Sequence, residues 1–201
     1  MNFDNPIRGL IMLCCLLLSA LATAATTDKP LPGDSIYQLP VILIDQDGKG
    51  FDWRSRRGAP QLVTMFYTAC PYMCPLIVDA GKSIEKALTP AQLGGLHLLF
   101  ISMDPTNDTP AALMALAKQR KLDTARWTLA SPQEQAVASV AGVLGVRYRK
   151  LANGDFNHTG ELILLDREGR VVARTEKIGS KADPEFLAAV QQAINLSSQP
   201  P

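Results

Sequence analysis

Two cysteines, Cys70 and Cys74, are the residues of this chain whose type and spacing most directly indicate chemistry. They lie in the stretch from Thr68 to Pro75, in which Pro75 suits the first turn of a helix. If Cys70 lies at the end of a strand and Cys74 one helical turn later, both thiols share one helix face, where the helix N-terminus lowers the pKa of a thiol. Two converging sulfurs can chelate one soft metal ion or close into a disulfide.

A purely structural disulfide is the less expected outcome for this pair. A bridge between Cys70 and Cys74 would close a very short loop, which removes little chain entropy from the unfolded state. We therefore expect metal or redox chemistry. The two other cysteines, Cys14 and Cys15, lie in an apolar run near the N-terminus, and the residues before them do not form a lipoprotein cleavage site. We interpret them as apolar residues of a signal peptide.

A metal site needs a third ligand, and the chain has two histidines. His97 lies within the apolar run from Leu96 to Met103, so we expect it to be a structural residue of a strand. His158 lies in a polar segment that we expect to be a loop, and it is the better third ligand. Two thiolates and one imidazole form a soft, low-coordination set, which suits copper and in particular Cu(I). Zinc would also accept this set, with a fourth group or water.

Four further residues near the motif are weaker candidates. Met65 and Met103 carry soft thioethers but fall in apolar runs typical of a core, whereas Met73 fits an exposed loop equally well. Asp104 ends the strand that we expect beside the one leading to Cys70. Its carboxylate is expected either to form a turn or to hydrogen-bond a metal ligand.

Hydrophobic patterning predicts the elements that position these residues. Apolar runs predict strands at 37–45, 51–53, 61–67, 96–103, 146–151, 161–165 and 171–175, and helical spacing predicts helices at 75–88, 110–120, 132–144 and 184–195. The order predicts an α/β protein with a central mixed β-sheet flanked by helices, an N-terminal β-hairpin and a hairpin near the C-terminus. The thioredoxin-like fold fits this order, and it places active cysteines between a central strand and a helix.

Length and composition indicate one domain. Of the 201 residues, 47% are hydrophobic and 19% are charged, and the net charge is +1, so a single core is expected and nucleic acid is not an expected partner. The apolar run from Gly9 to Ala22, which follows Arg8 and leads into Ala24 and Ala25, is typical of a cleavable secretory signal. We expect a signal peptide at 1–25, a thioredoxin-like domain at 26–196, a disordered tail at 197–201, and export to the periplasm. An uncleaved signal would instead tether the protein to the inner membrane.

Several short motifs occur together in one order: Phe66-Tyr-Thr68, Cys70-Pro-Tyr-Met-Cys74-Pro75, the strand end Phe100 to Pro105, Asp108-Thr-Pro110, and the distal His158. In this order they resemble the Sco (SenC) family of copper-binding, thioredoxin-like proteins, over about Pro40 to Ile194. The resemblance implies one copper per chain, as Cu(I) or Cu(II), bound by Cys70, Cys74 and His158. It also implies a role in cytochrome c oxidase assembly, either delivering copper to the binuclear copper site or reducing its thiols. The partners implied are the copper-site subunit of the oxidase and a periplasmic thiol reductant or copper donor.

Three residues depart from the family pattern, which usually has Gly at Phe66, Asp at Tyr72 and Asp at Asn157. They leave the three ligands in place but alter the surface where a partner would dock. Two alternatives to a copper chaperone stay open. One is a periplasmic thiol-disulfide oxidoreductase, an enzyme in which Cys70 attacks a disulfide and Cys74 resolves the mixed disulfide. The other is a module that binds copper without delivering it.

Overall fold

The structure, a computed structural model, describes residues 30–198. The chain divides into two units, Met1–Pro30 and Leu31–Pro201, and all described helices and strands lie in the second. The predicted signal peptide at 1–25 lies outside the described residues. Within residues 30–198, no helix combines the length and the apolar character that crossing a membrane requires.

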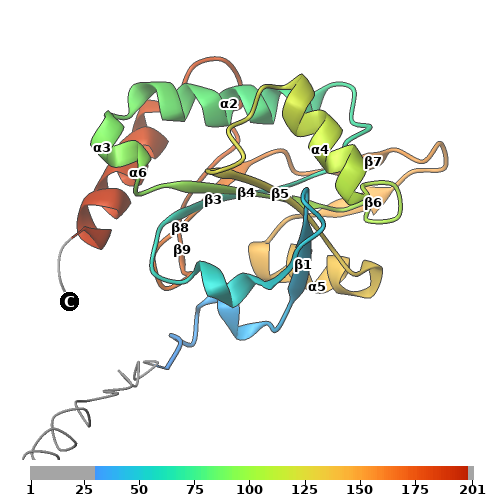
Figure 1. The fold of residues 1–201 in the computed structure, drawn as a ribbon, viewed down its shortest axis with the longest axis horizontal. Coiled ribbons are helices and arrows are strands. Elements are labelled where there is room, and N and C mark those ends of the chain that lie inside the picture. Colours follow the sequence, from blue (N-terminus) through green and yellow to red (C-terminus); the bar gives the residue numbers. More distant parts are fainter. Residues whose placement is uncertain (1–29, 199–201) are drawn as a thin grey trace, which may run out of the picture. The chain divides into compact units, whose positions relative to one another are not determined.

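A mixed sheet forms the centre of this unit (Figure 1). In the described part of the chain it has seven strands in the order β2-β1-β5-β4-β3-β8-β9. The strands are β1 (Ile42–Asp45), β2 (Gly50–Asp52), β3 (Gln61–Phe66), β4 (His97–Ser102), β5 (Trp127–Pro132), β8 (Leu162–Leu165) and β9 (Val171–Thr175). Strands β3, β4 and β5 are parallel, whereas β1 and β8 join them antiparallel. Strands β6 (Tyr148–Lys150) and β7 (Phe156–His158) form a separate antiparallel pair.

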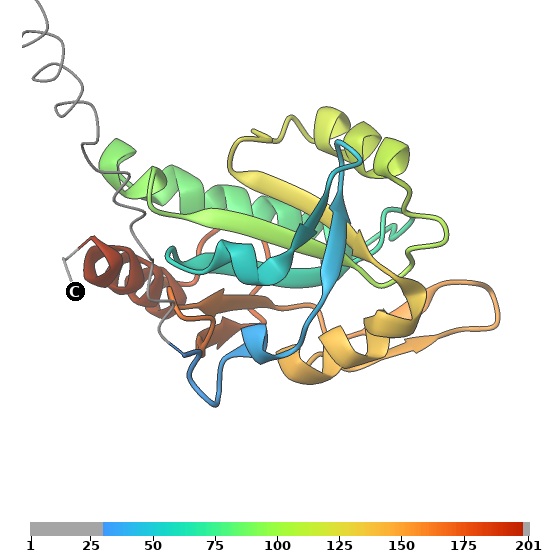
Figure 2. The same cartoon turned by 60° about the horizontal axis from the view of Figure 1, so that its bottom comes forward.

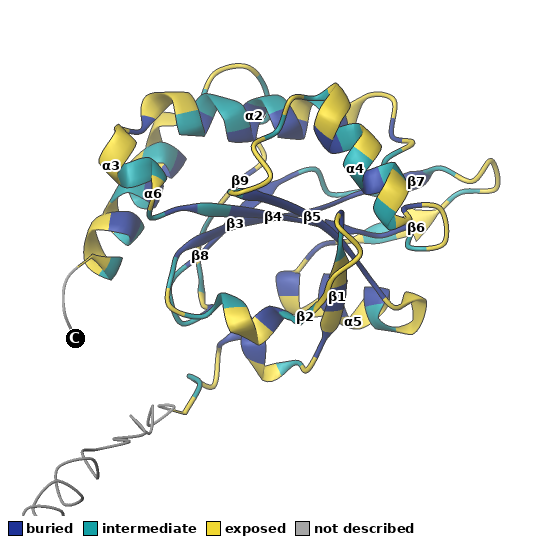
Figure 3. Cartoon of the chain, in the orientation of Figure 1, coloured by how far each residue is buried: buried dark blue, intermediate teal, exposed yellow. Residues whose placement is uncertain are grey.

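Helices cover both faces of the sheet, as the views in Figures 1 and 2 show. Helices α2 (Met73–Ala87) and α4 (Pro110–Gln119) lie over one face and α5 (Val137–Leu144) lies over the other, while α3 (Pro90–Leu93) contacts α6 (Pro184–Ser197). Buried residues concentrate in the strands and on the helix sides that look toward them (Figure 3). Every residue of β3 is buried, so the element that leads into the cysteine motif is anchored in the core.

The predicted mixed sheet with flanking helices and terminal hairpins is confirmed, but strand β5 is absent from the prediction. All residues of β5 are buried. Its sequence mixes apolar residues with Thr128, Ser131 and Pro132, so no continuous apolar run marks it. The predicted helix at 132–144 is wrong at its start, because Pro132 ends β5 and the α-helix begins only at Val137.

Both ends of the predicted domain also differ in detail. The expected strand at 37–45 is a 3-10 turn at Ile36–Gln38 followed by β1, because the Ser35 hydroxyl caps the turn by accepting from the Tyr37 N–H. At the other end, α6 extends to Ser197, the first residue of the expected tail. Residues 199–201 of that tail lie outside the described residues.

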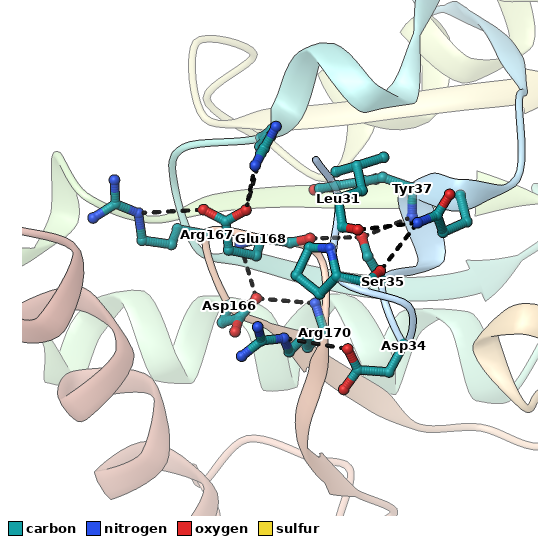
Figure 4. A network of polar contacts seen from close by, with 11 residues as sticks. Leu31, Asp34, Ser35, Tyr37, Asp166, Arg167, Glu168 and Arg170 are labelled. Atoms are coloured by element: carbon teal, nitrogen blue, oxygen red, sulfur yellow. Dashed lines mark hydrogen bonds and ion pairs between the residues drawn. The ribbon is translucent and has the colours of Figure 1, made fainter. Parts of the chain in front are cut away.

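Hydrogen bonds fasten the segment before β1 to the turn between β8 and β9 (Figure 4). The Ser35 hydroxyl donates to the Glu168 carbonyl at 2.6 Å, and the Ile36 N–H donates to the Gly169 carbonyl at 2.9 Å. An ion pair of 3.3 Å joins Arg170 to Asp34. These contacts hold the segment before β1 against the turn between β8 and β9, and the cysteine motif takes no part in them.

Candidate metal centre

The cysteine motif connects the end of β3 to the start of α2. Cys70 lies in the turn after β3, where its N–H donates to the Tyr67 carbonyl at 3.2 Å, and Cys74 lies in the first turn of α2. The Cys74 N–H donates to the Cys70 sulfur at 3.3 Å. Because Tyr72 at the N-cap provides no side-chain cap, the Cys70 sulfur satisfies one of the free N–H groups of the helix start. The sulfurs thus converge through the turn, and not because both cysteines lie in the helix.

The two thiols are buried, free and electrostatically unequal. Their exposed fractions are 9% for Cys70 and 5% for Cys74. The pKa of Cys70 is lowered to about 4, mainly by the hydrogen bond from the Cys74 thiol and also by the N–H groups of Cys74 and Tyr72 and the ring of His158, against the opposing effect of burial. The same hydrogen bond, together with burial, raises the pKa of Cys74. At neutral pH the metal-free reduced pair therefore holds one proton, on Cys74, and Cys70 is a thiolate.

His158 reaches the cysteines because of the strand order. Strand β8 runs antiparallel to β3, so the chain just before β8 arrives at the end of β3, and the Thr64 hydroxyl donates to the Glu161 carbonyl at 2.7 Å. His158 ends β7, where it pairs with Tyr148, and does not lie in the loop that we expected. Its Nδ1 lies 3.1 Å from the Thr159 carbonyl oxygen. A carbonyl only accepts, so Nδ1 carries the hydrogen and Nε2 is left for a metal.

The structure brings Cys70, Cys74 and His158 together. Their ligand atoms all lie within 4.8 Å of one another. Three donors placed about 2.0–2.3 Å from a shared ion at trigonal angles stand about 3.5–4.0 Å apart, so binding needs the donors to approach one another by no more than about 1 Å. Two sulfurs and one nitrogen in a buried setting fit one soft ion that accepts three ligands.

Tyr67 packs between the cysteine turn and the strand that carries His158. Its hydroxyl accepts a hydrogen bond of 3.4 Å from the Phe156 N–H. The centroid of its ring lies 5.1 Å from that of Phe156 and 6.1 Å from that of His158. Burial raises the pKa of Tyr67. Tyr67 stands in the motif Phe66-Tyr-Thr68, but nothing in the sequence assigned it a role; its signal is its position directly after β3, beside the cysteine turn.

Asp108 anchors the cysteine turn from the loop after β4. Its carboxylate accepts hydrogen bonds from the Thr68 N–H at 3.1 and 3.2 Å, from the Thr68 hydroxyl, and from the Ser102 hydroxyl at 2.5 Å. Asp108 is 1% exposed, and burial raises its pKa. Thr109, and not Asp108, caps α4. Strands β3 and β4 are parallel neighbours, so the loops that follow them meet.

Asp104, the other acidic candidate, forms a turn. Its carboxylate accepts from the Asn107 amide at 2.7 Å and pairs with Lys150 at 3.8 Å, and its N–H donates to the Ser102 hydroxyl. Within residues 30–198 it makes no hydrogen bond to Cys70, Cys74 or His158. The turn-forming alternative thus accounts for its hydrogen bonds within the described residues, and the ion pair joins the turn to β6.

The remaining candidates divide between core and surface. Met65 and Met103 are buried in the core. His97 begins β4 and pairs with Gln61, so it lies at the end of the sheet opposite the cysteine motif, where burial lowers its pKa. Met73 is 38% exposed and begins α2.

The three departures from the family pattern differ in their exposure. Phe66 is buried at the end of β3, where its ring packs edge-on against Phe100. Tyr72 is 82% exposed, and Asn157 is also exposed. Both line the hollow that contains Cys70 and His158, so they change its rim and not its donors.

The sheet order and a cysteine pair between a central strand and a helix define a protein of the thioredoxin-like class with a Cys-Cys-His group. The SCO1/SenC family model matches residues 32–195, and the chain belongs to this family.

Known relatives match this chain along most of their own length. The SCO2-like protein of Rickettsia felis is 28% identical over 185 residues, which cover 83% of this chain and 88% of the relative. The solved structure of Bradyrhizobium japonicum ScoI with copper bound is 27% identical, with a TM-score of 0.61, and the match covers 77% of this chain and 98% of that one. The solved structure of BsSco is 22% identical, with a TM-score of 0.67, over 79% of this chain and 93% of that one. It is described as a Sco protein of cytochrome c oxidase assembly with a disulfide switch.

Proposed function

We propose that this chain is a copper chaperone that delivers copper to the binuclear site in the copper-site subunit of a cytochrome c oxidase. One observation carries the proposal: the ligand atoms of Cys70, Cys74 and His158 lie within 4.8 Å of one another. Membership of the SCO1/SenC family and the copper bound to Bradyrhizobium japonicum ScoI support the choice of metal. Copper is here a cargo that the protein takes up and releases.

The chemistry of the group favours Cu(I). The Cys70 thiolate is available at neutral pH because its pKa is lowered to about 4. Cys74 gives up its proton on binding, so uptake of the ion releases a proton. His158 contributes Nε2, because Nδ1 is held by the Thr159 carbonyl. No carboxylate joins the group in the part of the chain that the structure describes, and such a set disfavours hard ions such as magnesium and calcium.

Titration of the reduced protein with Cu(I) in the presence of a competing chelator tests this proposal. We expect one equivalent to bind, and His158→Ala to weaken binding by at least about tenfold, the lower bound even for residues that only support a ligand. His97→Ala is the matched control, because His97 lies at the opposite end of the sheet. If His158→Ala binds as tightly as the wild type, the third ligand is wrongly assigned.

Thiol-disulfide exchange is the second candidate function, and the unequal thiols favour it. The Cys70 thiolate would attack a substrate disulfide, form a mixed disulfide and expel one substrate thiolate, which takes up the proton of Cys74. The Cys74 sulfur would then attack Cys70, closing the intramolecular disulfide and releasing the second substrate thiolate. The substrate is reduced by two electrons and the protein is oxidised by two. A periplasmic thiol reductant would restore the pair.

Reduction of insulin in the presence of a thiol reductant separates the two functions. The exchange reaction uses Cys70 and Cys74 alone, so it predicts turnover that survives His158→Ala. The chaperone predicts no faster reduction than the reductant alone, together with copper transfer to a reduced acceptor domain. Binding without transfer would indicate a copper-binding module.

Export is part of the proposal and rests on the apolar run from Gly9 to Ala22. We propose that the signal is removed near Ala24 or Ala25 and that the protein works in the periplasm. N-terminal sequencing of the protein recovered from the periplasmic fraction tests this. A chain that retains Met1 and sediments with membranes would contradict cleavage and indicate a tether.

A further inference from the structure

Met73 lies between the two cysteines in the sequence and is the first residue of α2. We propose that its thioether is a fourth, exchangeable donor that holds Cu(I) as the ion enters or leaves the group formed by Cys70, Cys74 and His158. This inference rests on the proposed copper function.

The side chain of Met73 extends from α2 to the segment that carries His158. Its Cγ, Sδ and Cε atoms lie 2.7, 2.8 and 3.3 Å from the position that a β-carbon on Gly160 would take. Gly160 follows His158 by two residues, and its missing side chain leaves the space that the thioether occupies. The sulfur of Met73 therefore lies against the backbone beside His158, although the residue as a whole is partly exposed.

Two hollows meet at this thioether. One of about 350 Å³ contains Cys70, and a second of about 530 Å³ is bordered by Arg147 and Arg149. Met73, Asn157 and His158 line both hollows.

Exposure increases from the cysteines to Met73. Cys70 is 9% exposed and Cys74 is 5% exposed, whereas Met73 is 38% exposed. Met73 thus lies between the buried sulfur of Cys70 and the solvent at the hollow that both residues line.

The chemistry of a thioether suits such an intermediate position. It is a soft donor that selects Cu(I). Because it is neutral and carries no proton, it binds and releases the ion without a proton transfer. A three-coordinate ion also has room for an incoming donor. The alternative role for Met73 is packing, for which methionine is well adapted and for which leucine is a substitute of similar volume. Replacement by leucine therefore distinguishes the two roles.

Methyl resonances of the methionines give a test that does not depend on delivery. We would label the methionine methyl groups of the reduced protein with ¹³C and add Cu(I) up to one equivalent. The Met73 resonance, assigned by its loss in Met73→Leu, is expected to shift. The Met114 resonance is the internal control, because Met114 is a half-buried residue of α4 that lines neither hollow.

Transfer kinetics give the second test. Met73→Leu is expected to retain one equivalent of Cu(I) but to slow its transfer to a chelator about tenfold, the lower end of the effects seen for residues beside a metal site. Gly160→Ala, which displaces the thioether without removing it, is expected to slow transfer as well, and Met114→Leu is expected to have no effect.

Two results would overturn the inference. A stationary Met73 resonance together with unchanged transfer in Met73→Leu would leave packing as its only role. A wild-type protein that binds no Cu(I) would overturn the proposed function with it, so the two failures are distinguishable.

Discussion

Replacement of Asp108 by asparagine tests how the cysteine turn is held. The Asp108 carboxylate accepts hydrogen bonds from the Thr68 N–H, the Thr68 hydroxyl and the Ser102 hydroxyl, and Asp108 is only 1% exposed. Asparagine has nearly the same shape but keeps one acceptor oxygen and carries no charge. Hydrogen bonds to a charged group contribute about 1.5–3 kcal/mol each, and a neutral amide avoids part of the cost of burying a charge.

We expect Asp108→Asn to lower the free energy of unfolding by about 2 kcal/mol, roughly the loss of one such bond. For a domain of this size that corresponds to a fall in Tm of about 4–8 °C. The turn that carries Cys70 would also be less fixed, so we expect Cu(I) affinity to fall about tenfold, as it does when residues that orient a ligand are changed. Urea unfolding of the reduced protein and competition titration measure the two effects.

Asp104→Asn is the matched control for this experiment. Asp104 is also a buried carboxylate of the loop after β4, but among the described residues its carboxylate pairs with Asn107 and Lys150 and with no residue of the cysteine turn. We expect it to affect stability without changing Cu(I) affinity. Equal losses of affinity in both variants, or an unfolding free energy in Asp108→Asn within about 0.5 kcal/mol of the wild type, the range usual for surface substitutions, would refute the assigned role of Asp108.

Two further predictions concern the thiols and the core. Because the pKa of Cys70 is lowered to about 4, alkylation of the metal-free reduced protein by iodoacetamide should be nearly constant from about pH 7 to about pH 5 and fall only as the pH drops through that pKa. Cys74→Ala removes the main hydrogen bond to that thiolate, so the decline in alkylation should move to higher pH. Mass spectrometry of the alkylated peptide measures the pH profile of each protein. An unchanged profile in Cys74→Ala would contradict the hydrogen bond between the two thiols. In the core, a β-carbon on Gly81 would lie 2.6 Å from the Trp127 ring, so Gly81→Ala should destabilise the domain by about 1–3 kcal/mol. Gly142→Ala is the control, because a β-carbon there meets open space in α5 and should not destabilise the domain. Urea unfolding measures both variants, and equal stabilities would contradict the close packing of Gly81 against Trp127.

Local patterns explain why much of the fold is predictable from the sequence. Strands β3 and β4 are rich in large apolar residues, which favours their burial, and the spacing of apolar residues in α2 indicates one buried side. Strand β5 was not predicted, because its burial depends on its place between β1 and β4 and not on its own composition. The strand expected at 37–45 begins only at Ile42 for a related reason. The Ser35 hydroxyl and a hydrogen bond to the distant turn at Gly169 hold a 3-10 turn before it.

The residue types and their spacing were enough to nominate all three donors. Cys70 and Cys74 are four residues apart between an apolar run and a helical pattern, where close sulfurs are expected, and His158 is the better of two histidines. That the three side chains meet, and that Asp108 supports the turn, depends on the pairing of the strands. Strand β8 pairs antiparallel with β3 and so returns His158 to the cysteines, whereas β4 pairs parallel with β3 and so places Asp108 under the turn. Strand pairing joins residues far apart in the chain, and no local pattern encodes which strands become neighbours.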